Sequence, residues 1–208
     1  NRQEGEGPYT QLILRGVTVI DGTGAPAYGP ADVVIEGNRI INIVIVGSAN
    51  SPIKEDGRPK LKAGGREINL FGKYVMPGLI DMHGHIGGEE QGTPAEYVYK
   101  LWLGHGITSI RDPGCGNGID FCASEKARSA ANQITAPRIY PYVFFGMGRN
   151  TPFTAPEQAR QWVREMKGKG AIGIKCFGYR PDILEAALDE VKKQGMRSIC
   201  HHAQTDVA

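Results

Sequence analysis

Two histidines separated by one residue, His83 and His85, are the first side chains whose spacing suggests chemistry. They end residues 76–85, a segment that predicts a buried apolar strand. Alternate residues of a strand share a face, so both imidazoles would point the same way, with Gly84 leaving room between them. Neutral imidazole is a preferred ligand of zinc and similar divalent ions. The pattern therefore indicates a metal site; two unrelated surface histidines in a glycine-rich loop are the alternative.

A lysine inside an apolar run is the second candidate. Lys175 lies within residues 171–177, and an ammonium group is costly to keep charged in a buried strand. We interpret it as an amine that loses its proton and reacts with carbon dioxide, giving an anionic carbamate able to bridge two metal ions. A surface lysine at a strand end is the alternative. His201 and His202, at the end of another apolar run, would add imidazoles.

These residues need a scaffold that gathers strand ends. After Pro77, apolar strand-like runs alternate with helical ones, and strand starts recur at intervals of roughly 30 residues, the length of a strand-plus-helix unit. The expected strand starts lie near Val75, Ile107, Ile139, Ala171 and Ser198. This repeat predicts an α/β fold, either a (β/α)₈ barrel or a doubly wound sheet. In a barrel, catalytic groups collect at the C-terminal ends of the strands.

The first 75 residues differ from the rest because they carry strand signals and no helix signal. The expected strands cover residues 12–20, 31–36, 39–46, 66–70 and 73–75. Residues 48–65 are polar and contain two prolines, which predicts an exposed loop. We therefore expect a small β domain over residues 1–75, followed by the barrel domain over residues 76–208.

Four segments together resemble the amidohydrolase superfamily of metal-dependent hydrolases. Val-Met-Pro-Gly-Leu-Ile-Asp-Met-His-Gly-His, residues 75–85, is similar to its first barrel strand, and residues 103–112 to its second. Ile-Lys-Cys-Phe, residues 174–177, resembles the strand that bears a carboxylated lysine, and residues 202–205 resemble the strand with the next metal histidine. The β domain is similar to part of the superfamily's small β-sandwich. The resemblance is closest to the imidazolonepropionase-like and prolidase-like branch, which includes Xaa-Pro and Xaa-Arg dipeptidases.

The resemblance implies roles for individual residues. His83 and His85 would bind the more buried metal, carboxylated Lys175 would bridge two metals, and His202 would bind the second. His202 is preferred to His201 because His-Ala-x-Thr matches the superfamily's position. The residues expected to orient these ligands or to line the pocket are Asp81, Asp112, His201, Arg149 and Tyr179.

The implied cofactor is a pair of divalent ions, with zinc as the first choice. They would share a bridging hydroxide and hydrolyse an amide-type C–N bond in a dipeptide, an N-acyl amino acid or a cyclic amide. One alternative is a mononuclear deaminase or imidazolone-type hydrolase, which would not need Lys175. The other is a non-catalytic scaffold protein of the same fold.

Composition limits the partners. The 208 residues carry a formal net charge of +2, with no basic run interleaved with aromatics, so nucleic acid is not expected. No apolar stretch reaches membrane-spanning length. The partners we expect are a small-molecule or dipeptide substrate and, for the complete protein, further copies of itself. Because the first residue is Asn1, either a leader has been removed or the chain is a fragment, and a cytoplasmic, periplasmic or secreted location stays open.

The expected barrel is incomplete. The residues after Pro77 number about half of the roughly 250 that such a barrel uses. The histidine of strand six and the aspartate of strand eight that the superfamily carries have no counterpart here. We therefore expect an N-terminal portion with about five βα units that is not a competent hydrolase by itself.

Overall fold

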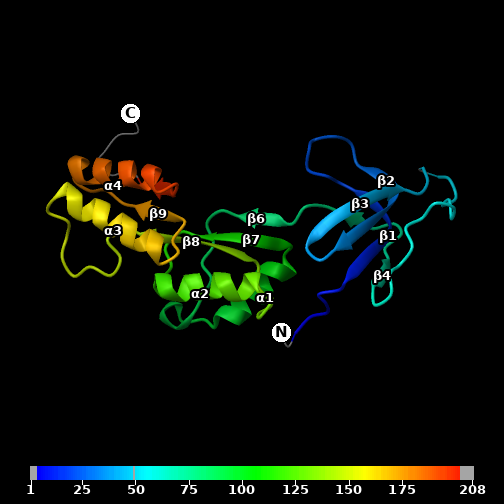
Figure 1. The fold of residues 1–208 in the computed structure, drawn as a ribbon, viewed down its shortest axis with the longest axis horizontal. Helices are drawn as coiled ribbons and strands as arrows, with labels where there is room; N and C mark the ends of the chain where they lie inside the picture. The colour runs from blue at the N-terminus through cyan, green and yellow to red at the C-terminus, as the bar shows by residue number, and fades with distance from the viewer. Residues whose placement is uncertain (1–3, 49, 202–208) are drawn as a thin grey trace. The chain divides into compact units, whose positions relative to one another are not determined.

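The computed structural model describes residues 4–48 and 50–201, which form two compact units (Figure 1). One unit covers Glu6–Pro77, and the other combines the described residues up to Gly5 with those from Gly78 onward. None of the described helices is long and apolar enough to cross a membrane.

The first unit is a five-stranded sheet, and among its described residues there is no helix, as the sequence predicts. Its strands are β1 (Gln11–Val19), β2 (Tyr28–Glu36), β3 (Arg39–Ile45), β4 (Arg66–Asn69) and β5 (Tyr74–Val75). The order is β3-β2-β1-β4, with β5 also paired to β1. β2 runs antiparallel to both β1 and β3, whereas β4 and β5 run parallel to β1. Gly37 provides the positive φ of the turn between β2 and β3.

Strand β3 lies at one edge of this sheet and is apolar on both faces. Ile40 and Ile41, neighbours that point to opposite sides, are 62% and 52% exposed, and Ile45 is 59% exposed. Within the described part of the chain, β3 pairs with β2 alone. Its outer edge and much of its apolar surface therefore face solvent.

A buried carboxylate, Asp32, ties the long polar loop to the sheet. Its side chain is fully buried and accepts hydrogen bonds from Arg15 (2.8 Å), from Arg58 (2.9 and 3.0 Å) and from the backbone N–H of Gly16 (2.9 Å). Arg58 belongs to residues 48–65, which we expected to be an exposed loop, yet its side chain is only 18% exposed. The loop is therefore anchored at this arginine, because a buried charge requires a partner.

The second unit is a parallel α/β half-barrel. Its strands are β6 (Leu79–Asp81), β7 (Ile107–Asp112), β8 (Arg138–Phe144), β9 (Gly173–Cys176) and β10 (Arg197–Cys200). The helices between them are η1 (Glu89–Gln91), α1 (Ala95–Gly104), α2 (Ile119–Ala130), α3 (Pro156–Gly168) and α4 (Pro181–Lys193). The sheet order is β10-β9-β8-β7-β6, and every neighbouring pair is parallel. This arrangement confirms the fold class that we predicted from the spacing of the strands.

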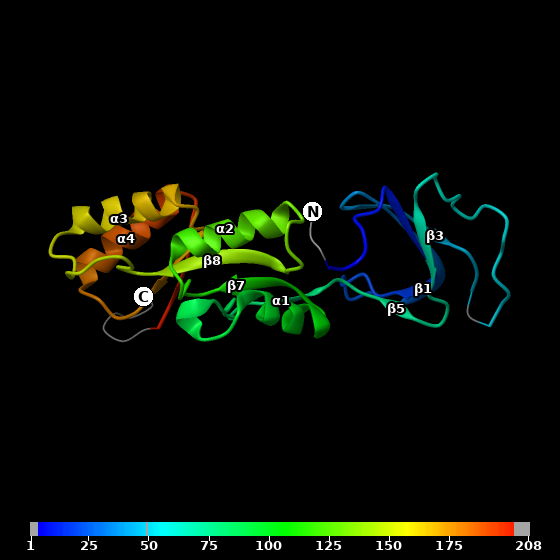
Figure 2. The ribbon, with the colours of Figure 1, turned by 90° about the horizontal axis from the view of Figure 1, so that it is seen from below.

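The core of the half-barrel lies between the sheet and its helices. Figures 1 and 2 show α3 and α4 side by side, and α2 running along β8. Ile110, Ile139 and Ile174, from three successive strands, are at most 2% exposed and belong to one apolar cluster. This packing fixes the strand ends from which the candidate residues project.

The first barrel strand differs from its prediction. We expected residues 76–85 to form a buried strand, but β6 has three residues and ends at Asp81. Leu79 and Ile80 are 50% and 63% exposed. The physical reason is that β6 is the last strand of the described sheet, so only β7 covers its side. His83 and His85 consequently lie in the loop after β6, where strand alternation does not orient them.

Replacing Asp32 with asparagine should destabilise the first unit. Burial acts to raise the pKa of the Asp32 carboxyl, but hydrogen bonds from Arg58, Arg15 and the Gly16 amide outweigh it and hold the pKa below its usual value. Asp32→Asn removes the charge between two arginines, and we expect a loss of about 3 kcal/mol in the free energy of unfolding at neutral pH. Urea denaturation measures this loss.

The pH dependence of the destabilisation by Asp32→Asn tests whether the stabilisation by Asp32 is electrostatic. Because the folded-state pKa is lowered, the stabilisation is complete above the unfolded pKa of about 3.9 and is lost as pH falls through the folded value. The difference between wild type and Asp32→Asn should therefore shrink in acid. Glu67→Gln, which removes a half-exposed partner of Arg15, is the control and should cost much less. A pH-independent difference would contradict the assignment.

Candidate metal centre at the strand ends

The loop that carries the two histidines is held in place by the end of β7. The backbone N–H of Gly84 donates to the carbonyl of Arg111 (3.1 Å), and Arg111 Nε donates to the carbonyl of Met82 (2.6 Å). Asp81, at the end of β6, accepts a hydrogen bond from the backbone N–H of His83 (2.8 Å). These bonds fix the path of the backbone on both sides of each histidine.

Asp112, the last residue of β7, is the central acceptor of the site. Its side chain is fully buried, and Oδ2 accepts from the backbone N–H of Ile86 (3.1 Å). Oδ1 accepts from the N–H groups of Gly114 (3.0 Å) and Cys115 (2.9 Å) and lies 3.3 Å from His85 Nδ1. One carboxylate therefore joins the loop after β6 to the loop after β7.

The two imidazoles lie near one another. Their ring centroids are 6.0 Å apart and their planes are nearly perpendicular, at 86°. The side chain of His85 is 47% exposed, and its backbone carbonyl accepts a hydrogen bond from Trp102 Nε1 (3.5 Å) on α1. His83 is also exposed. Both rings are thus open to a ligand while their backbone is restrained.

Gly84 is required by close packing beneath the loop. A Cβ atom at this position would lie 2.5 Å from Ile110 Cδ1 and 3.0 Å from Trp102 Cζ2. Ile110 is fully buried, so the neighbouring side chains cannot move away without disturbing the core. The glycine therefore lets the histidine loop sit directly on β7 and α1.

Lys175 lies in the middle of the buried strand β9, where every residue is buried. Its side-chain nitrogen is 3.2 Å from His201 Nε2 and 5.8 Å from the centre of the Phe177 ring. Among the described residues no carboxylate pairs with this amine. His201 follows Ile199 by two residues, and Ile199 pairs with Lys175, which explains why His201 and Lys175 share a face. His202, the expected ligand, lies outside the described residues.

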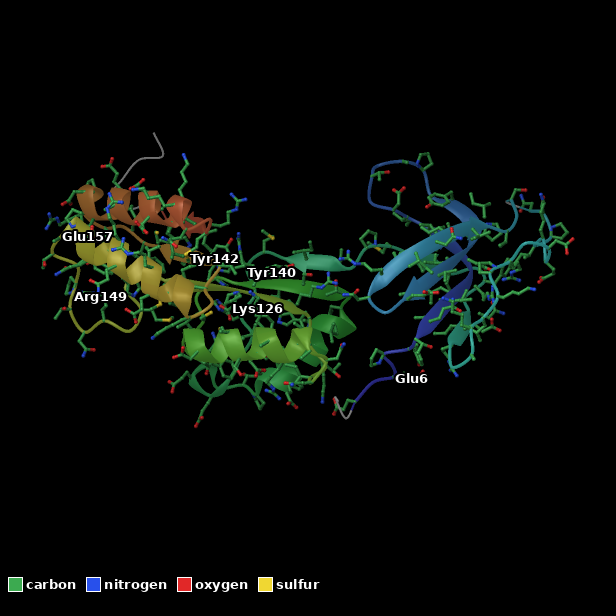
Figure 3. All side chains as sticks on the ribbon, in the orientation of Figure 1. Glu6, Lys126, Tyr140, Tyr142, Arg149 and Glu157 are labelled. Atoms are coloured by element: carbon green, nitrogen blue, oxygen red, sulfur yellow. The ribbon has the colours of Figure 1, made fainter. Side chains whose placement is uncertain are left out.

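The two expected pocket residues Arg149 and Tyr179 form a separate group. The guanidinium of Arg149 lies 4.3 Å from the centre of the Phe153 ring, and its Nε donates to the carbonyl of Thr151 (3.2 Å). The Tyr179 hydroxyl accepts a hydrogen bond from the Phe153 N–H. Both residues line a cavity of about 270 Å³, and Figure 3 shows Arg149 on the loop after β8. In the described part of the chain, no hydrogen bond or ion pair links this group to Lys175 or the histidines.

Relatives of known sequence cover part of the chain. No family model matches it. An adenine deaminase of Methanoculleus marisnigri is 39% identical over 129 residues, which are 58% of this chain and 24% of that protein. An adenine deaminase of Paracoccus denitrificans is 29% identical over 120 residues, 51% of this chain and 19% of that protein. The chain thus corresponds to about a quarter or less of the length of these relatives.

Solved structures share the fold over nearly the whole chain. A putative prolidase from Bifidobacterium longum has a TM-score of 0.68 and 23% identity, covering 95% of this chain and 51% of its own. Molinate hydrolase has a TM-score of 0.71 and 19% identity, with coverage of 93% and 54%. A protein described as an amidohydrolase has a TM-score of 0.67 and 21% identity, with coverage of 92% and 56%. These likenesses show that the chain shares the fold of these hydrolases.

Amidohydrolase-superfamily enzymes are generally metal-dependent, so the candidate residues can be tested for fit. His83 and His85 offer exposed imidazoles, the donors that zinc and similar ions prefer. Lys175 offers a buried amine with a histidine, not a carboxylate, beside it. These donors fit a divalent cation. The structure brings them together in pairs, and within residues 4–48 and 50–201 no three His, Cys, Asp or Glu side chains form a metal-binding group.

Two residues that support the candidate site were not predicted from the sequence. Trp102 contacts the histidine loop, and Asn117 joins the loops after β6 and β7 by donating to the Gly87 carbonyl (2.5 Å) and accepting from the Glu90 N–H (2.8 Å). Asn117 lies between two glycines in the loop after β7, a position typical of tight turns. This pattern predicts a turn but does not predict which loop Asn117 binds.

Gly84→Ala should disturb the histidine loop. The added methyl group overlaps Ile110 and Trp102, and overpacking of this kind costs about 1–3 kcal/mol. Thermal unfolding should show a lowered midpoint. The matched control is Gly104→Ala on α1, where an added Cβ meets no atom within 4 Å and helix propensity favours alanine. Equal midpoints for the Gly84→Ala variant and wild type would refute the packing argument.

Proposed function

We propose that the protein containing this chain is a metal-dependent hydrolase of amide-type C–N bonds, with His83, His85, Lys175 and His202 as metal ligands. The observation that supports it most is the environment of Lys175. Lys175 as a residue is 4% exposed, and its amine lies 3.2 Å from a histidine nitrogen and has no carboxylate partner among the described residues. A structural lysine in a core would be expected to have a carboxylate partner, because an uncompensated buried charge is costly.

The chain supplies the amine and a nearby proton acceptor for carboxylation of Lys175. The neutral amine would add to the carbon of carbon dioxide, forming an N–C bond, and one proton would leave the nitrogen. His201 Nε2 is the nearest described proton acceptor. The product is an anionic carbamate whose two oxygens are ligands of the type that hard divalent ions accept.

The histidine loop would supply the nitrogen ligands. Its backbone bonds to β7 hold His83 and His85 in place before any ligand binds, which lowers the entropy cost of binding. When bound, divalent metal ions supply Lewis-acid activation of water and of the substrate. Zinc is the metal we favour, because imidazole suits it and it is redox-inert.

A deaminase is the second candidate function. It is favoured by the 39% identity to an adenine deaminase over 129 residues. Adenine deamination also breaks a C–N bond by hydrolysis, but it releases ammonia and not an amino acid. The two candidates therefore share the chemistry and differ in the substrate.

Lys175→Ala should remove most of the bound metal. We expect elemental analysis of the full-length protein to find up to two divalent ions per chain. Lys175→Ala removes the amine that would become the bridging ligand, so metal content should fall to one ion or fewer. Lys167→Ala, at an exposed position on α3, is the control. Unchanged metal content in Lys175→Ala would refute the carbamate assignment.

Product analysis separates the two candidates. The metal-loaded protein should release free amino acids from a panel of dipeptides and N-acyl amino acids if the leading proposal is right. Release of ammonia from adenine, with no dipeptide cleavage, would favour the deaminase. Metal binding without either reaction would favour the non-catalytic scaffold.

A further inference from the structure

We propose that Asp112 is a positioning residue that holds the proton of the neutral His85 ring on Nδ1, leaving Nε2 as the nitrogen available to a metal. This inference rests on the proposed function, because it assigns the metal-binding atom of one of the proposed ligands. It also makes a statement about the metal-free protein that can be tested alone.

The orientation of the Asp112 carboxylate is fixed by the backbone. Three N–H groups, from Ile86, Gly114 and Cys115, donate to its two oxygens at 2.9–3.1 Å. These bonds hold the charged carboxylate in one orientation, with Oδ1 toward the His85 ring. His85 Nδ1, 3.3 Å from Oδ1, is the one ionisable group in ion-pair contact with Asp112 among the described residues.

This contact selects one form of the imidazole. A neutral imidazole carries a hydrogen on one nitrogen and a lone pair on the other. With the hydrogen on Nδ1, its partial positive charge lies beside the negative charge of Asp112. With the hydrogen on Nε2, two lone pairs would face each other beside a buried negative charge. The carboxylate therefore favours the Nδ1–H form, which is how carboxylates commonly orient metal-binding histidines.

The neighbouring histidine provides an internal comparison. Asp81 accepts from the backbone N–H of His83 and does not contact its ring. In the described part of the chain, the His83 ring makes no hydrogen bond or ion pair, and its one ring–ring contact is with His85. The structure thus restrains the ring of His85 through a carboxylate, whereas His83 lacks such a restraint.

Nitrogen-15 NMR of the metal-free chain tests the assignment directly. Among neutral rings, His85 should show the Nδ1–H form predominantly, and His83 a mixture of the two forms. A predominantly Nε2–H ring at His85 in the wild-type chain would overturn the proposal without any variant being needed.

Asp112→Asn then separates positioning from a merely structural role. The amide carries no negative charge to favour a hydrogen on Nδ1, so the His85 ring should shift toward the Nε2–H form. The matched control is Glu125→Gln, another buried carboxylate of the same unit, which pairs with Tyr99 and Arg128 and does not contact His85. Both variants lose a buried carboxylate, but only Asp112→Asn should change the ring. An unchanged His85 ring in folded Asp112→Asn would overturn the proposal.

Zinc affinity tests whether the tautomer of the His85 ring affects metal binding. We expect Asp112→Asn to weaken zinc binding by about 10–100-fold and Glu125→Gln to leave it close to wild type, in a competition titration with a chromophoric chelator. Equal zinc affinities in Asp112→Asn and Glu125→Gln would overturn the metal-positioning role. If His85 has the Nδ1–H form but wild type binds no zinc, the ring assignment is supported and the proposed function fails.

Discussion

A buried carboxylate at the end of β7 is the constraint on which the candidate site depends. Removing Asp112 from water costs free energy, and three backbone N–H groups offset that cost. Those donors come from two loops that are distant in sequence, so satisfying one charge forces both loops into fixed paths. The histidine loop is therefore restrained by the same hydrogen bonds that stabilise the buried Asp112 carboxylate.

Much of this architecture follows from local patterns. The recurrence of apolar runs at the length of a strand-plus-helix unit indicated the parallel half-barrel. Each such unit contributes one buried strand and one helix that packs against the sheet. The strand containing Lys175 was recognisable from its apolar run. The lysine within that run indicated a functional role because a buried charge is costly. The strands of the antiparallel pair β2–β3 were expected over residues 31–36 and 39–46, two apolar segments separated by two residues.

The parts that escaped prediction depend on contacts between distant segments. The orientation of His83 and His85 was attributed to strand alternation, but β6 ends before them and hydrogen bonds to β7 set the loop. No pattern within residues 76–85 contains that information. The same holds for Arg58, whose position in a polar stretch gave no indication that it reaches a buried carboxylate across the sheet.

The outer edge of β3 affects how the protein behaves in solution. Its sequence, Arg-Ile-Ile-Asn-Ile-Val-Ile, has one charge and no proline, and its isoleucines are exposed on both faces. A strand with unpaired backbone groups and this composition is a template for edge-to-edge association and aggregation. This strand contains none of the candidate metal ligands. A charged side chain placed in β3 would raise solubility without touching the metal centre.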